Sequence, residues 1–387
     1  MTSDRTRQGR FGELRSLVAS TPSEEAWRDI CALIEEWSAR EIAEVVAPYL
    51  AERLGSWPSH LRRTPASWLE RVFAGEEVPE LGLCRALVLS GRRPLTPQSV
   101  QRLFASGMCH VVEHVEVFGR VLKPGVLQVL CEYAEVAALV SLSSRRSEVM
   151  KRELSWFVSH ATTATLERLT MHLEYFDQQA MSALCEPGAL PSLVELGVAD
   201  NRLSVESLEM LWRAPVSASL LALDVSANRA LTGDAAWFMG EGAMPALEVL
   251  DVSMLQLRGG VRHLAQCEAP KLRALLVSSN ALGANDLGAL VMAEWMEHIE
   301  VLDVSSNPVG VKGVVHLLRS PAMSGLRELN LSECALDDQA AFVLAASDAL
   351  GSIERLRLGG NGFSRHGVRA ILEAPWFEPS RVELPRG

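Results

Sequence analysis

Leucine and other apolar residues recur along most of the chain in one pattern, L-x-x-L-x-L-x-x-N-x-L. The pattern is complete at residues 193–203 and returns at 272–282, 299–309 and 353–363. The first apolar position falls at residues 166, 193, 220, 247, 272, 299, 326 and 353, so successive copies are 27 residues apart except for one step of 25. A constant period of this length predicts a protein built from stacked, nearly identical repeats.

Weaker copies of the repeat precede the regular ones. Counting back by 27 residues from 166 leads to residues 139 and 112, where the apolar positions are kept, and one more repeat begins near Cys84. Six repeats lack the asparagine, and the residues at its position are Arg92, Arg120, Ser147, Glu174, Leu255 and Cys334. We expect about eleven repeats from residue 84 to the end, degenerate to about 165 and regular from 166.

Within each repeat the pattern predicts a short strand, a turn and a helix. The x-L-x-L stretch alternates polar and apolar residues, as a strand with one buried face does. The asparagine turns the chain, because its amide pairs with backbone groups that the bend leaves unsatisfied. A buried helix position follows eighteen residues after the first apolar one, at Leu211, Phe238, Leu290, Leu317, Leu344 and Ile371. Since one repeat cannot bury its own apolar face, we expect an α/β solenoid with a parallel sheet on one face and helices on the other.

These repeats resemble the leucine-rich repeat family, in particular its long-repeat subclass of ribonuclease inhibitor and the Ran GTPase-activating proteins. The resemblance covers residues 84–387 and is most specific from residue 166 onward. It implies a horseshoe with the strands on its concave face and the helices on its convex face. It also implies a protein-interaction scaffold, an inference that depends on the family rather than on the fold alone.

The first 80 residues do not repeat and are typical of helices. The expected helices lie at about 7–19, 23–38, 40–54 and 65–74, with Ser23 as an N-cap ahead of acidic residues. We predict a helical capping domain at 1–80, because a terminal repeat must be sealed, and a solenoid at 81–387. The alternative is that the helical segment is a second binding module. Residues 381–384 are expected to form a last strand that closes the sheet.

Composition narrows the class of function. The chain has 387 residues and a net charge of −11, from 37 basic and 48 acidic side chains, which disfavours binding to a nucleic-acid backbone. No secretory signal or apolar run of membrane-spanning length is visible, and the seven cysteines form no CxxC pair. We therefore expect a monomeric cytoplasmic protein with reduced thiols and no membrane contact. Only four basic residues are lysine, which suggests a GC-rich bacterial genome.

One motif indicates a possible metal site. Residues 110–114 match the H-x-x-E-H zinc signature, in which both histidines must lie on one helical turn. Here the segment enters a repeat strand, where His110 and His114 would lie about 13 Å apart and could not share one ion. The sequence has no phosphate-binding glycine loop and no nucleophile elbow. We expect no enzyme activity, no metal, no cofactor and no small-molecule substrate.

The remaining candidate is the surface formed by the strands. The outward-facing positions are acidic in several repeats, and we predict that this face binds a protein partner with a basic surface. The candidate partner-binding residues are Glu195, Asp224, Asp251, Asp303, Glu328, Asn330 and Arg357. The alternative is that L-D-V-S-x-N is only a structural consensus. Two other functions stay open: a nuclease inhibitor, and a GTPase-activating protein that presents an arginine such as Arg202 or Arg229.

Overall fold

The structure is a computed structural model and describes residues 7–90, 95–105, 112–119, 123–132, 139–147, 153, 156–158, 164–174, 176–228, 239–240 and 244–384. The chain divides into two compact units. The N-terminal unit comprises residues 1–170 and 190–192, and the C-terminal unit comprises residues 171–189 and 193–387. The helical segment predicted at 1–80 therefore lies in one compact unit with the first repeats.

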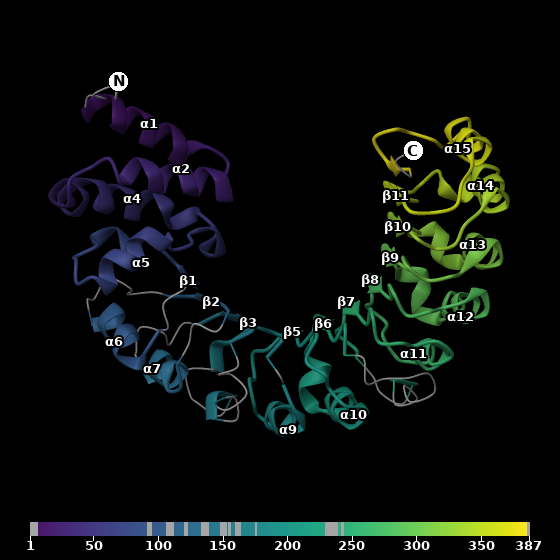
Figure 1. Ribbon diagram of the computed structural model, residues 1–387, viewed down its shortest axis with the longest axis horizontal. Coiled ribbons are helices and arrows are strands. Elements are labelled where there is room, and N and C mark those ends of the chain that lie inside the picture. The colour runs from purple at the N-terminus through teal and green to yellow at the C-terminus, as the bar shows by residue number, and fades with distance from the viewer. Residues whose placement is uncertain are drawn as a thin grey trace. The chain divides into compact units, whose positions relative to one another are not determined.

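The N-terminal unit begins with the helices that the sequence predicts (Figure 1). They are α1 (Arg7–Ala19), α2 (Glu24–Ile34), α3 (Ala39–Glu41), α4 (Ala47–Arg53) and α5 (Ala66–Phe73). The helix expected at 40–54 contains a π-helical stretch, Ile42–Val46, between α3 and α4. The Ser23 side chain accepts a hydrogen bond from the backbone N–H of Ala26 and caps α2, as predicted.

Tryptophans fill the interior of this helical segment. Trp27, Trp37, Trp57 and Trp68 are each at most 5% exposed. Two indole N–H groups are satisfied by backbone carbonyls, since Trp27 donates to Arg63 and Trp57 donates to Val18. Burial of these rings provides the helices with an apolar core of their own.

The helical segment also joins the edge of the sheet in its own unit. Arg63 pairs in parallel with Ala86, the first residue of β1 (Ala86–Leu89). The backbone N–H of Thr64 donates to the carbonyl of Ala86 at 2.8 Å, and the N–H of Ala86 donates to the carbonyl of Arg62 at 3.1 Å. Residues 62–64 thus satisfy backbone groups that would otherwise form an open edge.

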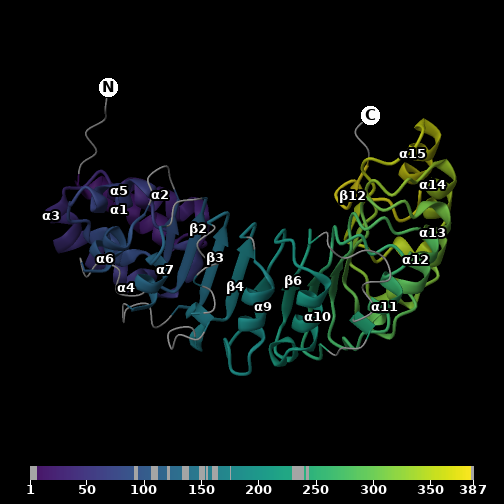
Figure 2. The ribbon, with the colours of Figure 1, turned by 60° about the horizontal axis from the view of Figure 1, so that its bottom comes forward.

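The strands of the N-terminal unit are parallel and follow their order in the sequence. β1 pairs with β2 (His114–Phe118), which pairs with β3 (Ser141–Arg145), as Figure 2 shows for β2 and β3. The register aligns Leu87, Val115 and Leu142, which are at most 2% exposed. Three further elements are α6 (Pro97–Ala105), α7 (Val126–Glu132) and β4 (Arg168–His172), which contains the division between the units. The degenerate repeats therefore keep the predicted core register.

Eight strands follow from β5 to β12 in the C-terminal unit, all parallel and in sequence order. They are β5 (Glu195–Gly197), β6 (Ala222–Asp224), β7 (Val249–Asp251), β8 (Ala274–Leu276), β9 (Val301–Asp303), β10 (Glu328–Asn330), β11 (Arg355–Arg357) and β12 (Val382–Glu383). Their central leucines occupy equivalent positions and are at most 2% exposed: Leu196, Leu223, Leu250, Leu275, Leu302, Leu329 and Leu356. The predicted register and the closing strand are both confirmed.

Helices cover the other side of these strands (Figure 1). They are α9 (Gln178–Cys185), α10 (Val205–Arg213), α11 (Val261–Leu264), α12 (Ala284–Leu290), α13 (Gly310–Leu318), α14 (Asp338–Ala345) and α15 (Arg365–Leu372). The predicted helix positions Leu211, Leu290, Leu317, Leu344 and Ile371 are at most 1% exposed, whereas Phe238 lies outside the described residues. This confirms the alternation of strand and helix on which the fold prediction depends, an open parallel solenoid.

The asparagine that recurs in the turns bridges adjacent repeats, and Asn280 is an example. Its Nδ2 donates to the carbonyls of Val252 at 2.8 Å and Val277 at 3.1 Å, and its Oδ1 accepts from the N–H of Leu255 at 2.8 Å. The same arrangement occurs at Asn201, Asn228, Asn307 and Asn361. The repeat with Leu255 needs no asparagine of its own for this N–H, because the next repeat supplies the acceptor.

Candidate protein-binding face

The strand register of the C-terminal unit brings the predicted acidic residues into one row. Gly197, Asp224, Asp251, Leu276, Asp303, Asn330, Arg357 and Glu383 occupy equivalent positions on β5 to β12. On β6 to β11 each lies next in sequence to the buried leucine of its strand, so its side chain points to the opposite face. We call Asp224, Asp251 and Asp303 the acidic row, which Leu276 interrupts between Asp251 and Asp303.

One carboxylate oxygen of each aspartate supports the turn that follows its strand. The Oδ1 atoms of Asp224, Asp251 and Asp303 accept hydrogen bonds of 2.8–2.9 Å from the N–H groups of Ser226, Ser253 and Ser305. This is the structural part of the L-D-V-S consensus. The second oxygen, Oδ2, has a different environment in each repeat, and this difference determines what each aspartate offers to a ligand.

Asp224 faces a histidine that the sequence analysis did not single out. The Nε2 atom of His172 lies 3.5 Å from the Oδ2 of Asp224. Burial raises the pKa of Asp224, but His172 and Ser226 outweigh it, so that the pKa is lowered overall. The aspartate is therefore stabilised in its charged form by its own unit.

Asp303 is satisfied by a neutral neighbour. Its Oδ2 accepts a hydrogen bond from Nδ2 of Asn330 at 2.8 Å, and the Oδ1 of Asn330 in turn accepts from the N–H of Ser332. Asn330 therefore stabilises Asp303 by a hydrogen bond and is also its neighbour at the end of the acidic row.

Asp251 has no cationic partner among the described residues. Its Oδ1 accepts a hydrogen bond from the N–H of Ser253, and the side chain of Ser253 also hydrogen-bonds to the carboxylate. Burial raises the pKa of Asp251, the hydrogen bonds from Ser253 lower it, and the charges of Asp224 and Asp303 raise it, so that the net shift is upward. Its half-buried carboxylate is the least compensated of the acidic row.

The other predicted residues differ in availability. Glu328 forms an ion pair with Arg355, and Arg357 lies 3.7 Å from Glu383, so both charges are partly neutralised within the unit. Glu195 is exposed at the start of β5, with Ala222 as its neighbour in the register. The strands place all seven predicted residues on one face. Among the described contacts, Asp251 has only the uncharged Ser253 as a side-chain partner, and Glu195 has none.

A second row, two residues earlier on the same strands, is apolar. Ala222, Val249, Ala274 and Val301 are aligned across β6 to β9, and we call them the apolar row. The side chain of Val249 is 40% exposed, unusually high for a large apolar residue of this chain. This row was not predicted from the sequence. Apolar residues recur at its position at the repeat spacing of 27, 25 and 27 residues, which could have indicated it.

A third row, one residue before the apolar row, alternates in charge. Arg273 pairs with Glu300, and Arg327 lies 3.8 Å from Glu300 and 3.5 Å from Glu354. These exposed side chains neutralise one another across β8 to β11. Each of these ion pairs contributes little to stability. Because their charges cancel, the acidic row provides the net negative charge of this face.

The N-terminal unit has a charged residue at the same strand position, Glu116 on β2. Its Oε2 accepts a hydrogen bond from Arg63 at 2.5 Å, and Arg63 also lies 3.5 Å from Glu24. Burial raises the pKa of Glu116, and Arg63 offsets only part of that rise, so that the pKa stays raised overall. Here the carboxylate is paired with a cation from the helical segment.

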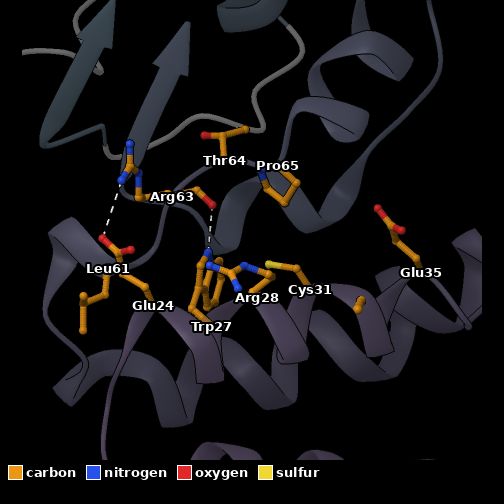
Figure 3. Close-up of a pocket in the computed structure, with 10 residues that line it drawn as sticks. Glu24, Trp27, Arg28, Cys31, Glu35, Leu61, Arg63, Thr64 and Pro65 are labelled. Atoms are coloured by element: carbon orange, nitrogen blue, oxygen red, sulfur yellow. Dashed lines mark hydrogen bonds and ion pairs between the residues drawn. The ribbon is translucent and has the colours of Figure 1, made fainter. Parts of the chain in front are cut away.

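Figure 3 shows a pocket beside this junction, between α2 and residues 61–65. Its volume is about 400 Å³, and Trp27, Arg28 and Cys31 of α2 line one side together with Glu35, the residue that follows the helix. Several lining groups bond within the unit, since Glu35 accepts from Trp68 and the indole of Trp27 donates to the Arg63 carbonyl. Burial raises the pKa of the Cys31 thiol far above its usual range, so the thiol is unreactive.

The remaining sequence candidates are placed as follows. His114 lies on β2, as predicted, and its Nδ1 is 2.7 Å from the Ser141 hydroxyl, whereas His110 lies outside the described residues. The described part of the chain holds no group of three potential metal ligands. Arg202 is exposed in the turn after Asn201 with φ of 59°, and Arg229 lies outside the described residues.

No helix in the described ranges is long and apolar enough to cross a membrane.

Comparison with known proteins gives partial matches. Over 216 residues the chain is 31% identical to Tonsoku-like protein of Danio rerio, covering 50% of this chain and 15% of that protein. Over 103 residues it is 38% identical to NLRC5 of Mus musculus, covering 26% of this chain and 5% of that protein. The chain therefore spans only a small part of these curated relatives.

A solved structure shares the fold. A chain in the crystal structure of the yeast Rad7 and Elc1 complex aligns with a TM-score of 0.53 at 13% identity, covering 97% of this chain and 94% of that chain. The leucine-rich repeat family model matches residues 296–318, which include β9 and α13. Together, the family-model match and the strand, asparagine turn and helix that recur along the chain support its assignment to the leucine-rich repeat family.

Proposed function

We propose that this protein is an interaction scaffold that binds a basic protein surface on the strand face of its C-terminal unit. The observation that carries the proposal is the environment of Asp251. Its half-buried carboxylate lies beside Asp224, with Asp303 two strands away beyond Leu276, and has no cationic partner among the described residues. Like charges on neighbouring strands are unfavourable, and a basic partner would relieve them.

The arrangement of neighbouring charges supports the same proposal. The arginines of this face are engaged with glutamates, as in the Arg273–Glu300 and Arg357–Glu383 pairs. A partner would therefore meet Asp251 as the least compensated charge of this face and the apolar row as surface to cover. The preformed sheet lowers the ordering cost of binding, because its strands are fixed before the partner arrives.

The test is quantitative capture of partners from the native host, identified by mass spectrometry. The bait is the full chain, compared with its Asp224→Asn, Asp251→Asn and Asp303→Asn triple variant. A matched control changes three exposed acids in the turns after helices: Glu268→Gln, Glu294→Gln and Asp348→Asn. We expect the first variant to lose its partner and the control, with the same change in net charge, to keep it. Equal capture by wild type and the first variant would overturn the proposal.

A narrower proposal is that the partner is an enzyme which the chain regulates. The resemblance to ribonuclease inhibitor and Ran GTPase-activating proteins motivates it. Repeats of 25 or 27 residues, most of them with a strand and a helix within the described ranges, support that subclass. Arg202 is an exposed residue at a left-handed turn position of the C-terminal unit. Once a GTPase partner is captured, Arg202→Ala should lower the rate of GTP hydrolysis without weakening binding. An unchanged rate would exclude this role for Arg202.

In this proposal the chain acts as a monomer in the cytoplasm and does so by binding alone, without a cofactor. Sedimentation of the full chain over a range of concentrations tests the monomer, since self-association would raise the sedimentation coefficient. A bacterial source also stays a prediction of the lysine-poor composition.

A further inference from the structure

The acidic row and the apolar row form one amphipathic footprint on β6 to β9. Along each strand the two rows are two residues apart, so their side chains lie about 7 Å apart on the same face. Leu276 occupies the third position of the acidic row and adds an apolar contact between Asp251 and Asp303. A segment that covers both rows must carry basic and apolar side chains together.

The spacing of the rows favours a helix as that segment. Neighbouring strands are about 4.8 Å apart, so Asp224, Asp251, Leu276 and Asp303 lie at about 0, 4.8, 9.6 and 14.4 Å across the sheet. In an α-helix of 1.5 Å rise, residues i, i+3, i+7 and i+10 share one face at about 0, 4.5, 10.5 and 15 Å. In an extended chain, side chains on one face lie about 6.8 Å apart. This distance does not match the spacing of about 4.8 Å between neighbouring strands, so the second side chain already misses its strand.

Charges at the two ends of the footprint favour one direction for the helix. Glu195 and Asp224 lie at one end, and Arg355 and Arg357 lie beyond the other. The N-terminus of a helix carries partial positive charge and its C-terminus partial negative charge. The helix therefore points its N-terminus towards β5 and its C-terminus towards β11.

We propose that the footprint binds an amphipathic basic α-helix of a partner protein, lying across β6 to β9 with basic residues at i, i+3 and i+10 and an apolar residue at i+7. This inference rests on the proposed function and adds the partner's secondary structure and sequence pattern. The basic residues oppose Asp224, Asp251 and Asp303, and the apolar residue opposes Leu276. Apolar residues on the flank of the helix cover Val249 and Val301.

The test uses fluorescent alanine-based peptides and the full chain. The matched peptide carries Lys at i, i+3 and i+10 and Leu at i+7, and a shuffled peptide of equal composition and helicity spreads them around the helix. Anisotropy titrations should show about tenfold tighter binding of the matched peptide, as expected for three charge pairs together. Equal affinity for both peptides, or for an extended proline-containing peptide with the same charges, would overturn the helix.

A register swap makes the test independent of folding defects. Leu276→Asp should bind a peptide with Lys at i+7 more tightly than the matched peptide, while the wild type keeps the opposite preference. The Glu268→Gln, Glu294→Gln and Asp348→Asn variant should behave as wild type. If neither preference appears although native-partner capture still depends on the acidic row, the helix is wrong and the proposed function stands. If capture is also independent of the row, the proposed function itself fails.

Discussion

The two units place an acidic side chain at the same strand position, but they treat it differently. In the N-terminal unit, Glu116 accepts a hydrogen bond from the cationic side chain of Arg63, a residue of the helical segment. In the C-terminal unit, Asp251 lies beside Asp224, with Asp303 two strands away, and has no cation among the described residues. The same repeat position is thus paired with an arginine at Glu116 and left without a cation at Asp251.

The backbone arrangement of the strands is the same in the two units. Parallel register, buried alternate residues and an outward-facing second position recur in both units. The difference therefore comes from the side chains next to the strands and not from the strands themselves. Four experiments test this difference between the units.

The largest expected effect is deletion of residues 1–80. It removes residues 62–64, which pair with β1, and the tryptophan-rich core that covers this edge. An uncovered strand edge and apolar end promote aggregation, so the truncated chain should be recovered in the void volume of a gel-filtration column. A monomeric truncated chain with unchanged melting would instead identify the helical segment as an independent module.

Leu302→Ala tests the buried side of the C-terminal strands. Leu302 is 1% exposed, and its truncation should lower the free energy of unfolding by about 2–5 kcal/mol through lost transfer energy and a cavity. Leu276→Ala is the matched control, because this leucine lies one strand away on the outward face and should cost less than about 1 kcal/mol. Urea denaturation followed by circular dichroism measures both. Similar losses for the two variants would contradict the assignment of the faces.

Arg63→Ala tests neutralisation in the N-terminal unit. It leaves the half-buried Glu116 without its cation and should lower the free energy of unfolding by about 1–2 kcal/mol. The double variant Arg63→Ala, Glu116→Gln should recover part of that loss, since no uncompensated charge remains. Additive losses in the double variant would show that the pair does not couple.

The smallest expected effects separate two neighbours in the acidic row. The pKa of Asp251 is raised on folding, so its contribution to stability falls as the pH rises above the unfolded value near 3.8. Asp251→Asn should therefore raise the melting temperature slightly at pH 7 and change it little at pH 3.

The pKa of Asp224 is lowered on folding, so its contribution to stability is present above the unfolded pKa and is lost as the pH falls below it. Asp224→Asn should therefore lower the melting temperature at pH 7. Melting scans by calorimetry at both pH values check the signs, and shifts of the same sign for both variants would refute the distinction.

The sequence determined the repeat and its register, because each repeat reports the same buried positions independently. Seven leucines predicted at equivalent core sites are buried, and the predicted helices at the N-terminus occur at nearly the predicted residues. The period also predicted that Asp224, Asp251 and Asp303 share one row, since alternation within a strand and stacking between repeats are local properties.

Only the tertiary structure decided which of those charges are compensated. His172 lies 52 positions before Asp224 in the sequence yet approaches it within 3.5 Å, and Arg63 reaches Glu116 across a similar separation. The alternating row of Arg273, Glu300 and Arg327 likewise removes charge from the face. A pKa or an ion pair depends on distance and burial in three dimensions, and the repeat pattern specifies the backbone positions but not the partners that long side chains select.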